Sequence, residues 1–405
     1  MLRLVSKVTI YQLTDWNSIK RNSVYEFRFV NNITIESSWD QLTDTAKLIF
    51  PRNMYFLNEN TGVKENWQGK NFYAGDTVPI IQRGDKIKIE LGYTWFDGFK
   101  DVTEMHPEFE GFIVRVFNKT PIEVECEDYM WKLKQIKAPN KTYYEKDWSV
   151  ETMLQDMLKG SDIDFKVRDS ITTKIGDFLS ENETVAEVLA RLRKDKHLNS
   201  YIRRIENVDG SVKHELRCSG IVYYPEDQRD TENGAERLRE WVFDFNKNII
   251  SDNLEYKLKE DVNLHIKAFS VNKEEGTETT KTGKTKKTNK RLSVVVPDEN
   301  IHIGGETKTL YFYDVKSEAE LKRLATERLN RIWFAGLRGG FESFGLPSVR
   351  HGDRIYCQSR QIKEKTGTYL CKKVVKTFGL GGYRQDIDLD MRIDGITDAD
   401  INAGL

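Results

Sequence analysis

Most of the chain alternates between apolar and polar residues with a period of two. The alternation is clear in residues 24–29, 33–36 and 86–91, where every second residue is apolar. Successive side chains of a strand point to opposite faces of the sheet, so these runs predict strands with one solvated face. We therefore expect a mixed but mainly β protein of the α+β class.

Three segments instead carry apolar residues at helical intervals, each behind a residue that can cap a helix N-terminus. A hairpin is also predicted over residues 201–218, because Asp209-Gly210 is a turn signal between two alternating runs. The predicted helices and their caps are "SVETMLQDMLKG" (149–160, Ser149-x-x-Thr152), "SENETVAEVLARLRKD" (180–195, Ser180-x-x-Glu183) and "SEAELKRLATERLNR" (317–331, Ser317-x-x-Glu320).

Four segments recur in the same order, which predicts an internal duplication of residues 20–130 and 250–395. Two short turns, Gly84-Asp85 and Gly352-Asp353, each precede a strand and are the predicted structural turns of the repeat. The aligned pairs are "EFRFVNNITI" (26–35) with "EYKLKEDVNL" (255–264), "LIFP" (48–51) with "VVVP" (294–297), Gly84-Asp85-Lys86-Ile87 with Gly352-Asp353-Arg354-Ile355, and "IEVECED" (122–128) with "IDLDMRI" (387–393).

The duplication divides the chain into three predicted domains. Residues 1–135 form a first β-domain, residues 136–250 a small α/β middle domain, and residues 251–405 a second β-domain. The second domain contains a long basic loop (269–291) and one helix (317–331).

The basic stretch "EEGTETTKTGKTKKTNKR" (274–291) contains Gly283-Lys284-Thr285, which resembles the end of a phosphate-binding loop. Six residues separate Gly276 from Gly283, whereas a phosphate cradle requires four, and a strand rather than a helix is predicted to follow. Six cations lie between Lys281 and Arg291 without an acid. We therefore interpret the stretch as a flexible, solvated connection whose replacement by "SSWDQLTDT" leaves folding intact.

Composition narrows the function further. The 405 residues carry a net charge of -1 at pH 7, so there is no overall electrostatic case for nucleic-acid binding. The four cysteines have no CxxC spacing, which favours reduced thiols. No apolar run has membrane-spanning length and no signal peptide is evident, so we expect no stable membrane insertion.

The sequence contains no clear pattern of a metal-binding or catalytic site. None of the six histidines is paired at helical spacing, and His214-Glu215 lacks the second histidine of a metalloprotease helix, so no metal is expected. Asp386-x-Asp388-x-Asp390 lacks the glycine and glutamate of a calcium loop and predicts a strand with an acidic face. No nucleophile signature appears. We expect no catalytic residue, no cofactor and no small-molecule substrate.

A duplicated sheet protein has one consequence for assembly. If such a chain forms a trimer, two similar domains per subunit give a ring of six quasi-equivalent positions. A three-fold object can then match a six-fold one.

On four segments the chain resembles the baseplate hub proteins of contractile-tailed phages, as in the Mu-like tail hub and late-control D families. The resemblance covers nearly the whole chain and depends on the order of patterns rather than on invariant residues. The segments are "SSWDQLTDTAKLIFPRN" (37–53), "IEVECEDYMWKLKQ" (122–135), "SEAELKRLATERLNR" (317–331) leading into "GFESFGLPSVRHGDRI" (340–355), and "GTYLCKKVVKTFGLGGYRQDIDLDM" (367–391).

The resemblance implies a homotrimeric structural protein of the virion tail baseplate, made in the bacterial cytoplasm. It also implies that residues 1–135 and 251–405 are two similar tube-like β-barrel domains that flank the middle region. It implies a pseudo-hexameric ring that contacts the six-fold tail tube on one face, the trimeric spike on the other, and DNA only in transit through its channel. Because the chain ends soon after the second copy, we expect the spike to be a separate polypeptide.

Two other classes stay open. A β-sandwich adhesin or carbohydrate-binding protein would use exposed aromatics, which Trp95, Phe96 and Phe99 could supply, although we expect these to pack on their own domain. A cell-wall hydrolase delivered by the tail is the enzymatic alternative, for which no catalytic residue can be named.

Overall fold

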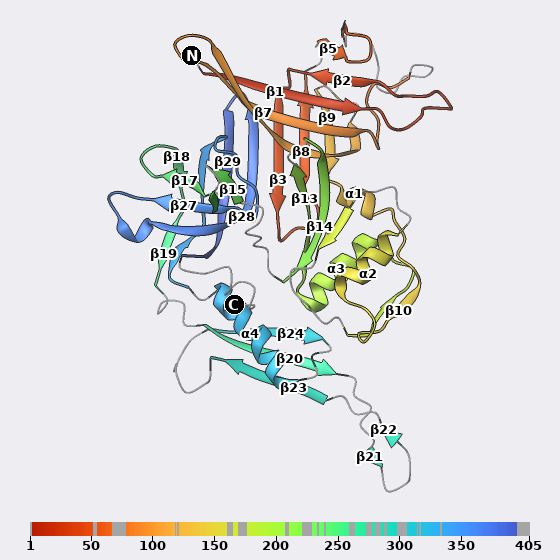
Figure 1. The fold of residues 1–405 in the computed structure, drawn as a ribbon, viewed down its shortest axis with the longest axis vertical. Coiled ribbons are helices and arrows are strands. Elements are labelled where there is room, and N and C mark those ends of the chain that lie inside the picture. The colour runs from red at the N-terminus through yellow and green to blue at the C-terminus, as the bar shows by residue number, and fades with distance from the viewer. Residues whose placement is uncertain are drawn as a thin grey trace.

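The structure, a computed structural model, describes residues 2–51, 55–66, 78–117, 119, 121–159, 165–168, 176–206, 210–220, 229–232, 235–238, 240–258, 264–272, 278–279, 285–286, 290–297, 306–313, 315, 317–332 and 334–394. Over these residues it is mainly β, as the alternation predicts. A large sheet occupies the upper part of the view in Figure 1, helices α2 and α3 lie at the lower right, and a smaller sheet with α4 lies at the bottom.

The first part of the chain supplies nine strands, and the last part supplies eight more with a short 3-10 helix. The first set is β1 (Arg3–Tyr11), β2 (Val24–Phe27), β3 (Asn32–Ser38), β4 (Thr45–Phe50), β5 (Tyr55–Asn58), β6 (Val63–Asn66), β7 (Lys86–Phe96), β8 (Asp101–Phe117) and β9 (Ile122–Glu127). The second set is β17 (Trp241–Asp244), β18 (Ile249–Asp252), β19 (Glu255–Lys257), β25 (Gly336–Arg338), β26 (Gly340–Phe344), β27 (Arg354–Gln358), η2 (Lys363–Lys365), β28 (Gly367–Gly379) and β29 (Gly382–Arg392).

Both sets contribute to one large sheet. Its main path runs β18-β26-β29-β28-β3-β4-β9-β8-β7-β1-β2-β5-β6, and β17 and β27 attach beside β28. The two halves are joined where β28 pairs with β3, from Lys373 opposite Ser38 to Gly379 opposite Asn32. Within the described residues the sheet stays open and neither half closes, so the expected pair of separate barrels is not confirmed.

The two Gly-Asp turns are built alike. The glycines have positive φ angles, +92° at Gly84 and +81° at Gly352, which residues with a side chain rarely adopt. The Gly84 N–H donates to the carbonyl of Ile113 at 2.8 Å, and the Ile113 N–H donates to the carbonyl of the turn's aspartate at 2.9 Å. In the second turn the Gly352 N–H donates to the carbonyl of Cys371 at 2.7 Å, and the Cys371 N–H donates to the carbonyl of Asp353 at 2.9 Å.

The strands around these turns also correspond. The second strand after each turn contains an irregularity directly after the residue bonded to the turn. It lies between Ile113 and Arg115 in β8 and between Cys371 and Lys373 in β28. Each half then orders four strands in the same way, β3-β4-β9-β8 in the first and β18-β26-β29-β28 in the second. We infer from this shared order that the halves are copies of one unit.

Three of the four sequence alignments nevertheless use the wrong residues. The place of β3 is taken by β18 and β19, upstream of most of the aligned segment 255–264, and "VVVP" lies in β23, outside the large sheet. In the last alignment Glu125 is paired with Asp390, but the sheet places Glu125 opposite Arg115 and Asp388 opposite Lys373. A two-residue shift leaves the alternation of a strand unchanged, so the pattern alone cannot detect it.

The middle region packs helices and a small sheet around a separate core. Its elements are α1 (Met130–Leu133), β10 (Lys141–Tyr143), α2 (Val150–Leu158), β11 (Phe165–Arg168), β12 (Phe178–Ser180), α3 (Val185–Lys196), β13 (Asn199–Glu206), β14 (Val212–Ser219), β15 (Arg229–Glu232) and β16 (Ala235–Leu238). The predicted hairpin is β13–β14; its Asp209 lies outside the described residues. Because β17 and β18 pair with β27 and β26, we propose that the last domain begins near residue 240 rather than 251.

Two of the three predicted helix caps are confirmed. Ser149 and Thr152 form a capping box at α2, and Ser317 Oγ accepts a hydrogen bond from the Glu320 N–H at 3.2 Å. The box at the second helix is wrong, because α3 begins one turn later, with Thr184 as its N-cap and Glu187 as its partner. Ser180 and Thr184 both fit the capping pattern. The helix begins at the later one because the buried apolar face of α3 starts at Val185.

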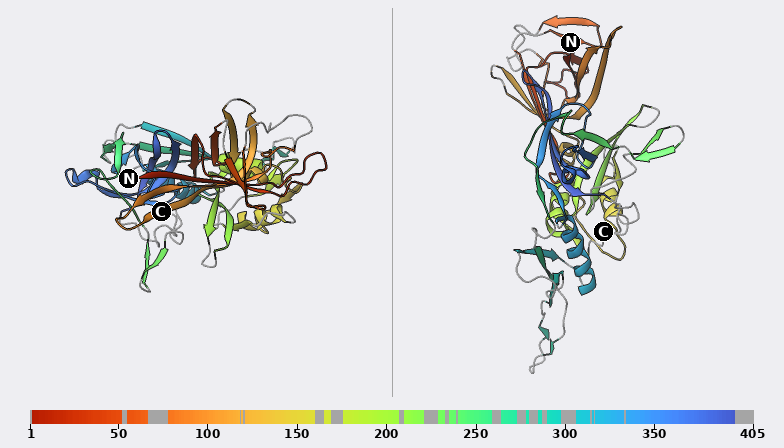
Figure 2. Two further views of the ribbon diagram at one scale, coloured as in Figure 1. Left: turned by 90° about the horizontal axis from the view of Figure 1, so that it is seen from above. Right: turned by 90° about the vertical axis from the view of Figure 1, so that its left-hand side faces the viewer.

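The remaining elements form a unit inserted into the second half. It consists of β20 (Leu264–Asn272), β21 (Glu278–Thr279), β22 (Thr285–Lys286), β23 (Lys290–Val296), β24 (Glu306–Tyr313) and α4 (Glu318–Ile332). The three-stranded sheet β23-β20-β24 packs α4 through Leu321, Ala325 and Leu329. Figure 2 shows the unit as an extension at the end of the molecule away from the N-terminus.

The expected basic loop 269–291 is shorter than predicted at both ends, because β20 continues to Asn272 and β23 begins at Lys290. Gly276 and Gly283 lie outside the described residues. Since β20 and β23 pair as a hairpin without residues 274–289, replacing that segment by a short turn should leave the fold intact. We expect a melting temperature within about 2 °C of the wild type, measured by circular dichroism; a much larger loss would show that the segment packs.

Candidate functional site: a buried ionic junction

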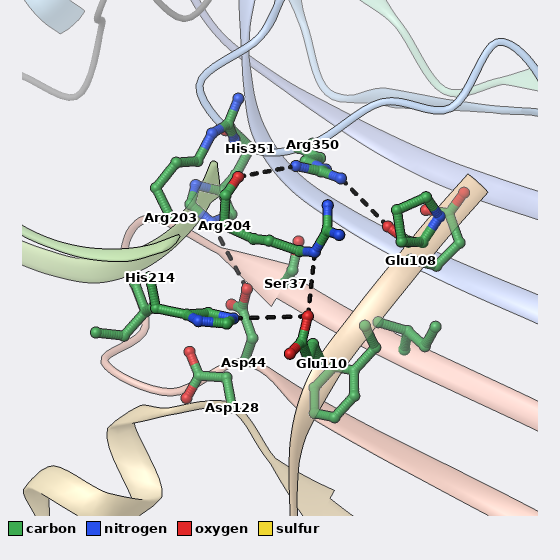
Figure 3. Close-up of a pocket in the computed structure, with 14 residues that line it drawn as sticks. Ser37, Asp44, Glu108, Glu110, Asp128, Arg203, Arg204, His214, Arg350 and His351 are labelled. Carbon is green, nitrogen blue, oxygen red and sulfur yellow. Dashed lines mark hydrogen bonds and ion pairs between the residues drawn. The ribbon is translucent and has the colours of Figure 1, made fainter. Parts of the chain in front are cut away.

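A group of buried charged side chains lies where the first half, the middle region and the second half of the chain meet (Figure 3). The loop before β4 and strand β8 supply acids, β13 and β14 supply arginines and a histidine, and the turn before β27 supplies an arginine and a histidine. The polar residues are Ser37, Asp44, Glu108, Glu110, Asp128, Arg203, Arg204, His214, Arg350 and His351.

Glu110 on β8 is the centre of the first cluster. It accepts a hydrogen bond from Arg204 Nε at 3.1 Å and lies 2.6 Å from Lys86 Nζ and 3.7 Å from His214 Nε2. Burial alone would raise the pKa of the Glu110 carboxyl, but the neighbouring His214 and Lys86 outweigh it and hold the pKa well below its ordinary value. His214 also stacks on Tyr129, with ring centroids 3.6 Å apart. Glu110 therefore ties the first half to the middle region.

Glu108, two residues earlier on β8, ties the first half to the second. It accepts hydrogen bonds from the Tyr383 hydroxyl at 2.8 Å and from Ser348 Oγ at 2.9 Å, and it is paired with Lys376. Burial raises the pKa of the Tyr383 hydroxyl, and the Glu108 charge raises it further. Since the two acids lie on the same strand, β8 connects all three parts of the chain.

A second carboxylate pair lies beside this centre. Burial raises the pKa of the Asp128 carboxyl well above its ordinary value, and the charge of Asp44 raises it further. His351 Nε2 lies 3.6 Å from Asp44 Oδ2, and the His351 ring packs edge-on against Tyr201. The contact between Asp44 and His351 therefore joins the loop before β4 to the turn before β27.

The predicted turn aspartates are buried and ion-paired. Asp85 accepts two hydrogen bonds from Arg21, at 3.0 and 2.7 Å, and the two side chains are 0% and 1% exposed. Asp353 accepts from Arg203 Nη2 at 2.8 Å and from Trp241 Nε1 at 3.2 Å. Arg203 comes from the middle region, so the second turn belongs to the junction, whereas the first lies apart from it.

The junction is suited to holding parts together rather than to chemistry. Its cavity of about 70 Å³ has room for only a few water molecules. Glu108 and Glu110 face cations, and no group of three metal-ligating side chains occurs in the part of the chain that the structure describes. The four cysteines are buried, and burial raises the pKa of the Cys126, Cys357 and Cys371 thiols, which disfavours the reactive thiolate.

Only part of this junction can be predicted from the sequence. The Gly352-Asp353 turn has a recognisable pattern. Glu108, Glu110, Arg203 and Arg204 lie on alternating strands among many similar charges, where the pattern does not distinguish them. The one available signal is the adjacent arginine pair in the predicted hairpin, since one member of such a pair must point to the buried face. The acidic strand expected at residues 386–390 is confirmed as part of β29, with Asp386 and Asp388 exposed.

The expectation that the aromatics near residue 96 pack on their own domain is only partly correct. Trp95 packs against the first core, but Phe96 is 57% and Phe99 is 95% exposed at the end of the β7–β8 hairpin. These two rings are available to a partner surface.

Comparisons with known proteins define the class of fold. No family model and no curated protein sequence matches the chain. Among solved structures, the tail protein from Neisseria meningitidis MC58 is 12% identical with a TM-score of 0.55, and each chain covers 98% of the other. The 43 kDa tail protein of prophage MuSo2 from Shewanella oneidensis is 11% identical with a TM-score of 0.51, covering 95% of this chain and 97% of that one.

A chain of the Francisella PdpA–VgrG complex has a TM-score of 0.56 at 8% identity and covers 98% of this chain, which spans 59% of its length. At these identities the likeness shows the fold, and the fold is that of phage tail proteins. The expected resemblance is confirmed at this level. None of the described helices is both long enough and apolar enough to cross a membrane.

Proposed function

We propose that this chain is a structural hub of a phage tail baseplate or of a related contractile injection system, and that it acts as a homotrimer. The observation that carries the proposal is the repetition of a four-stranded unit, β3-β4-β9-β8 and β18-β26-β29-β28, joined edge to edge through β28 and β3. Three chains would place six similar units around one axis, as an adaptor between six-fold and three-fold partners requires.

The partners follow from this role. One face of the ring would meet the tail tube, the other would hold the spike, and DNA would cross only the central channel. Likeness to tail proteins and to a chain of the PdpA–VgrG complex supports a place in the virion baseplate. The ionic junction would act as a rigid joint that fixes the middle region against both halves when the tail contracts.

A non-enzymatic role fits the small cavity and the buried thiols better than a tail-associated hydrolase does. A second candidate, a surface- or carbohydrate-binding protein, is favoured by one observation, the exposed Phe96 and Phe99. A glycan array would support it through selective binding that is lost in the double variant Phe96→Ala/Phe99→Ala.

The hub proposal predicts the mass and shape of the purified protein. Light scattering during size-exclusion chromatography should give three times the 47.2 kDa of one chain for the protein alone, and a larger mass when the spike protein is added. Electron microscopy should show a three-fold ring with a central hole and six similar lobes. A monomer under all conditions, with no ring in the presence of spike, contradicts the proposal.

A further inference from the structure

The inserted unit has one sheet face that its own helix does not cover. Strand β20 lies between β23 and β24, and α4 packs on the face that carries Ile266 and Ala268 (Figure 2). Alternate residues of the three strands point to the opposite face. The residues of that opposite face that matter here, called the insert face, are Lys267, Phe269, Arg291, Ser293, Thr309 and Tyr311.

Three side chains of the insert face form a stack across the strands. The Arg291 guanidinium carbon lies 4.1 Å from the centre of the Phe269 ring, and the Tyr311 ring stacks on Phe269 with centroids 5.8 Å apart and an interplanar angle of 23°. Because β20 is the middle strand, Arg291 and Tyr311 approach Phe269 from opposite sides. Tyr311, on β24, therefore ends the stack, and it is 51% exposed. A further planar group can stack on it.

The insert face is positively charged. Lys267 and Arg291 are both exposed, and neither has a carboxylate partner among the described residues. The hydroxyl residues Ser293 and Thr309 lie opposite Phe269 and Lys267 and are exposed as well. None of the outward positions of the three strands is acidic. Although the whole chain has a net charge of -1, this face is therefore complementary to an anion.

The sheet that carries the insert face is held against the middle region. His197, at the C-terminal end of α3, has its Nε2 atom 3.0 Å from the Tyr311 carbonyl oxygen, and its ring packs edge-on against Phe312. Arg328 of α4 donates a hydrogen bond to the His197 carbonyl at 3.0 Å. The backbone that carries Tyr311 is thus fixed before any ligand arrives, which lowers the cost of ordering on binding.

We propose that the insert face binds single-stranded nucleic acid. An unpaired base stacks on the exposed Tyr311 ring, and the neighbouring phosphates pair with Lys267 and Arg291. The hydroxyls of Ser293 and Thr309 donate to phosphate oxygens. A duplex fits less well because its bases already stack on one another, and a polyphosphate or an acidic peptide satisfies the cations without extending the aromatic stack. The site goes beyond the hub role and does not depend on it.

Fluorescence anisotropy of the full chain with a labelled oligothymidylate of about 12 nucleotides tests the stacking. Tyr311→Ala should weaken binding about tenfold, because the ring that stacks on the base is lost. The matched control is Tyr144→Ala in the middle region, since Tyr144 is also 51% exposed and has Lys146 Nζ 6.0 Å from its ring centre. This control should leave binding unchanged. An abasic strand of equal length should bind the wild type about as weakly as oligothymidylate binds Tyr311→Ala.

The salt dependence tests the phosphate contacts. Lys267→Ala and Arg291→Ala should each weaken binding of the normal and the abasic strand, and should each reduce the slope of log affinity against log salt by about 0.7. The effect of Tyr311→Ala should persist when residues 274–289 are replaced by a short turn, because that change removes most cations of the basic stretch but leaves the insert face in place.

Three results overturn the proposal. The first is no measurable binding of the oligonucleotide. The second is binding that Tyr311→Ala does not change and that an abasic strand, a duplex or polyphosphate equals, which is attraction by charge alone. The third is tighter, Tyr311-dependent binding of an acidic polysaccharide such as heparin, which assigns the face to a glycan instead.

Discussion

Replacing Asp85 by alanine is expected to destabilise the protein by about 3–5 kcal/mol, because it leaves the Arg21 guanidinium buried without its carboxylate. Asp85 also accepts the Gln82 N–H at 2.8 Å, so the turn before β7 loses its internal hydrogen bond as well. The free energy of unfolding should be measured by urea denaturation, as a shift in midpoint.

Two further variants test whether the buried charge of Arg21 causes the loss of stability. Asp353→Ala at the second turn should cost less, since the Arg203 side chain is 11% exposed, against 1% for Arg21. The double variant Asp85→Leu/Arg21→Met should recover much of the loss, because it removes both buried charges together. An Asp85→Ala protein as stable as the wild type would show that the buried pair contributes little.

Glu110→Gln is expected to cost about 3 kcal/mol near neutral pH, because Arg204 and Lys86 lose their common anion in the interior. The folded-state pKa of Glu110 is held below its ordinary value, so the ionised carboxylate stabilises the fold above about pH 4.5. That contribution is lost as the pH falls towards the folded-state pKa. The difference in unfolding free energy between wild type and variant should be constant from pH 6 to 8 and shrink below about pH 4.

Asp128→Asn is the control with the opposite sign. Burial and the charge of Asp44 raise the pKa of Asp128 in the folded protein, so ionising it opposes folding once the pH exceeds its ordinary value. The variant should therefore match or exceed the wild type in stability near pH 7, and any gain should disappear in acid. If both variants had the same pH dependence, the opposite pKa shifts assigned to Glu110 and Asp128 would be wrong.

The hub proposal connects these local effects to assembly. Asp85 stabilises the turn from which β7 leads to β8, and β8 carries the junction acids Glu108 and Glu110. We expect Asp85→Ala to impair trimer formation only through folding. Glu110→Gln should loosen the middle region against β8.

The amino-acid sequence by itself determined the features that depend only on residues close together along the chain. Strand alternation, the caps of α2 and α4, the β13–β14 hairpin and the two Gly-Asp turns could be predicted because each is specified within a few positions of the chain. Only the tertiary structure decided which strands are neighbours. A period-two pattern fits any partner and any even shift, so the β28–β3 joint, the correspondence of β18 and β19 with β3, and the meeting of Glu110 with Arg204 follow from three-dimensional packing alone.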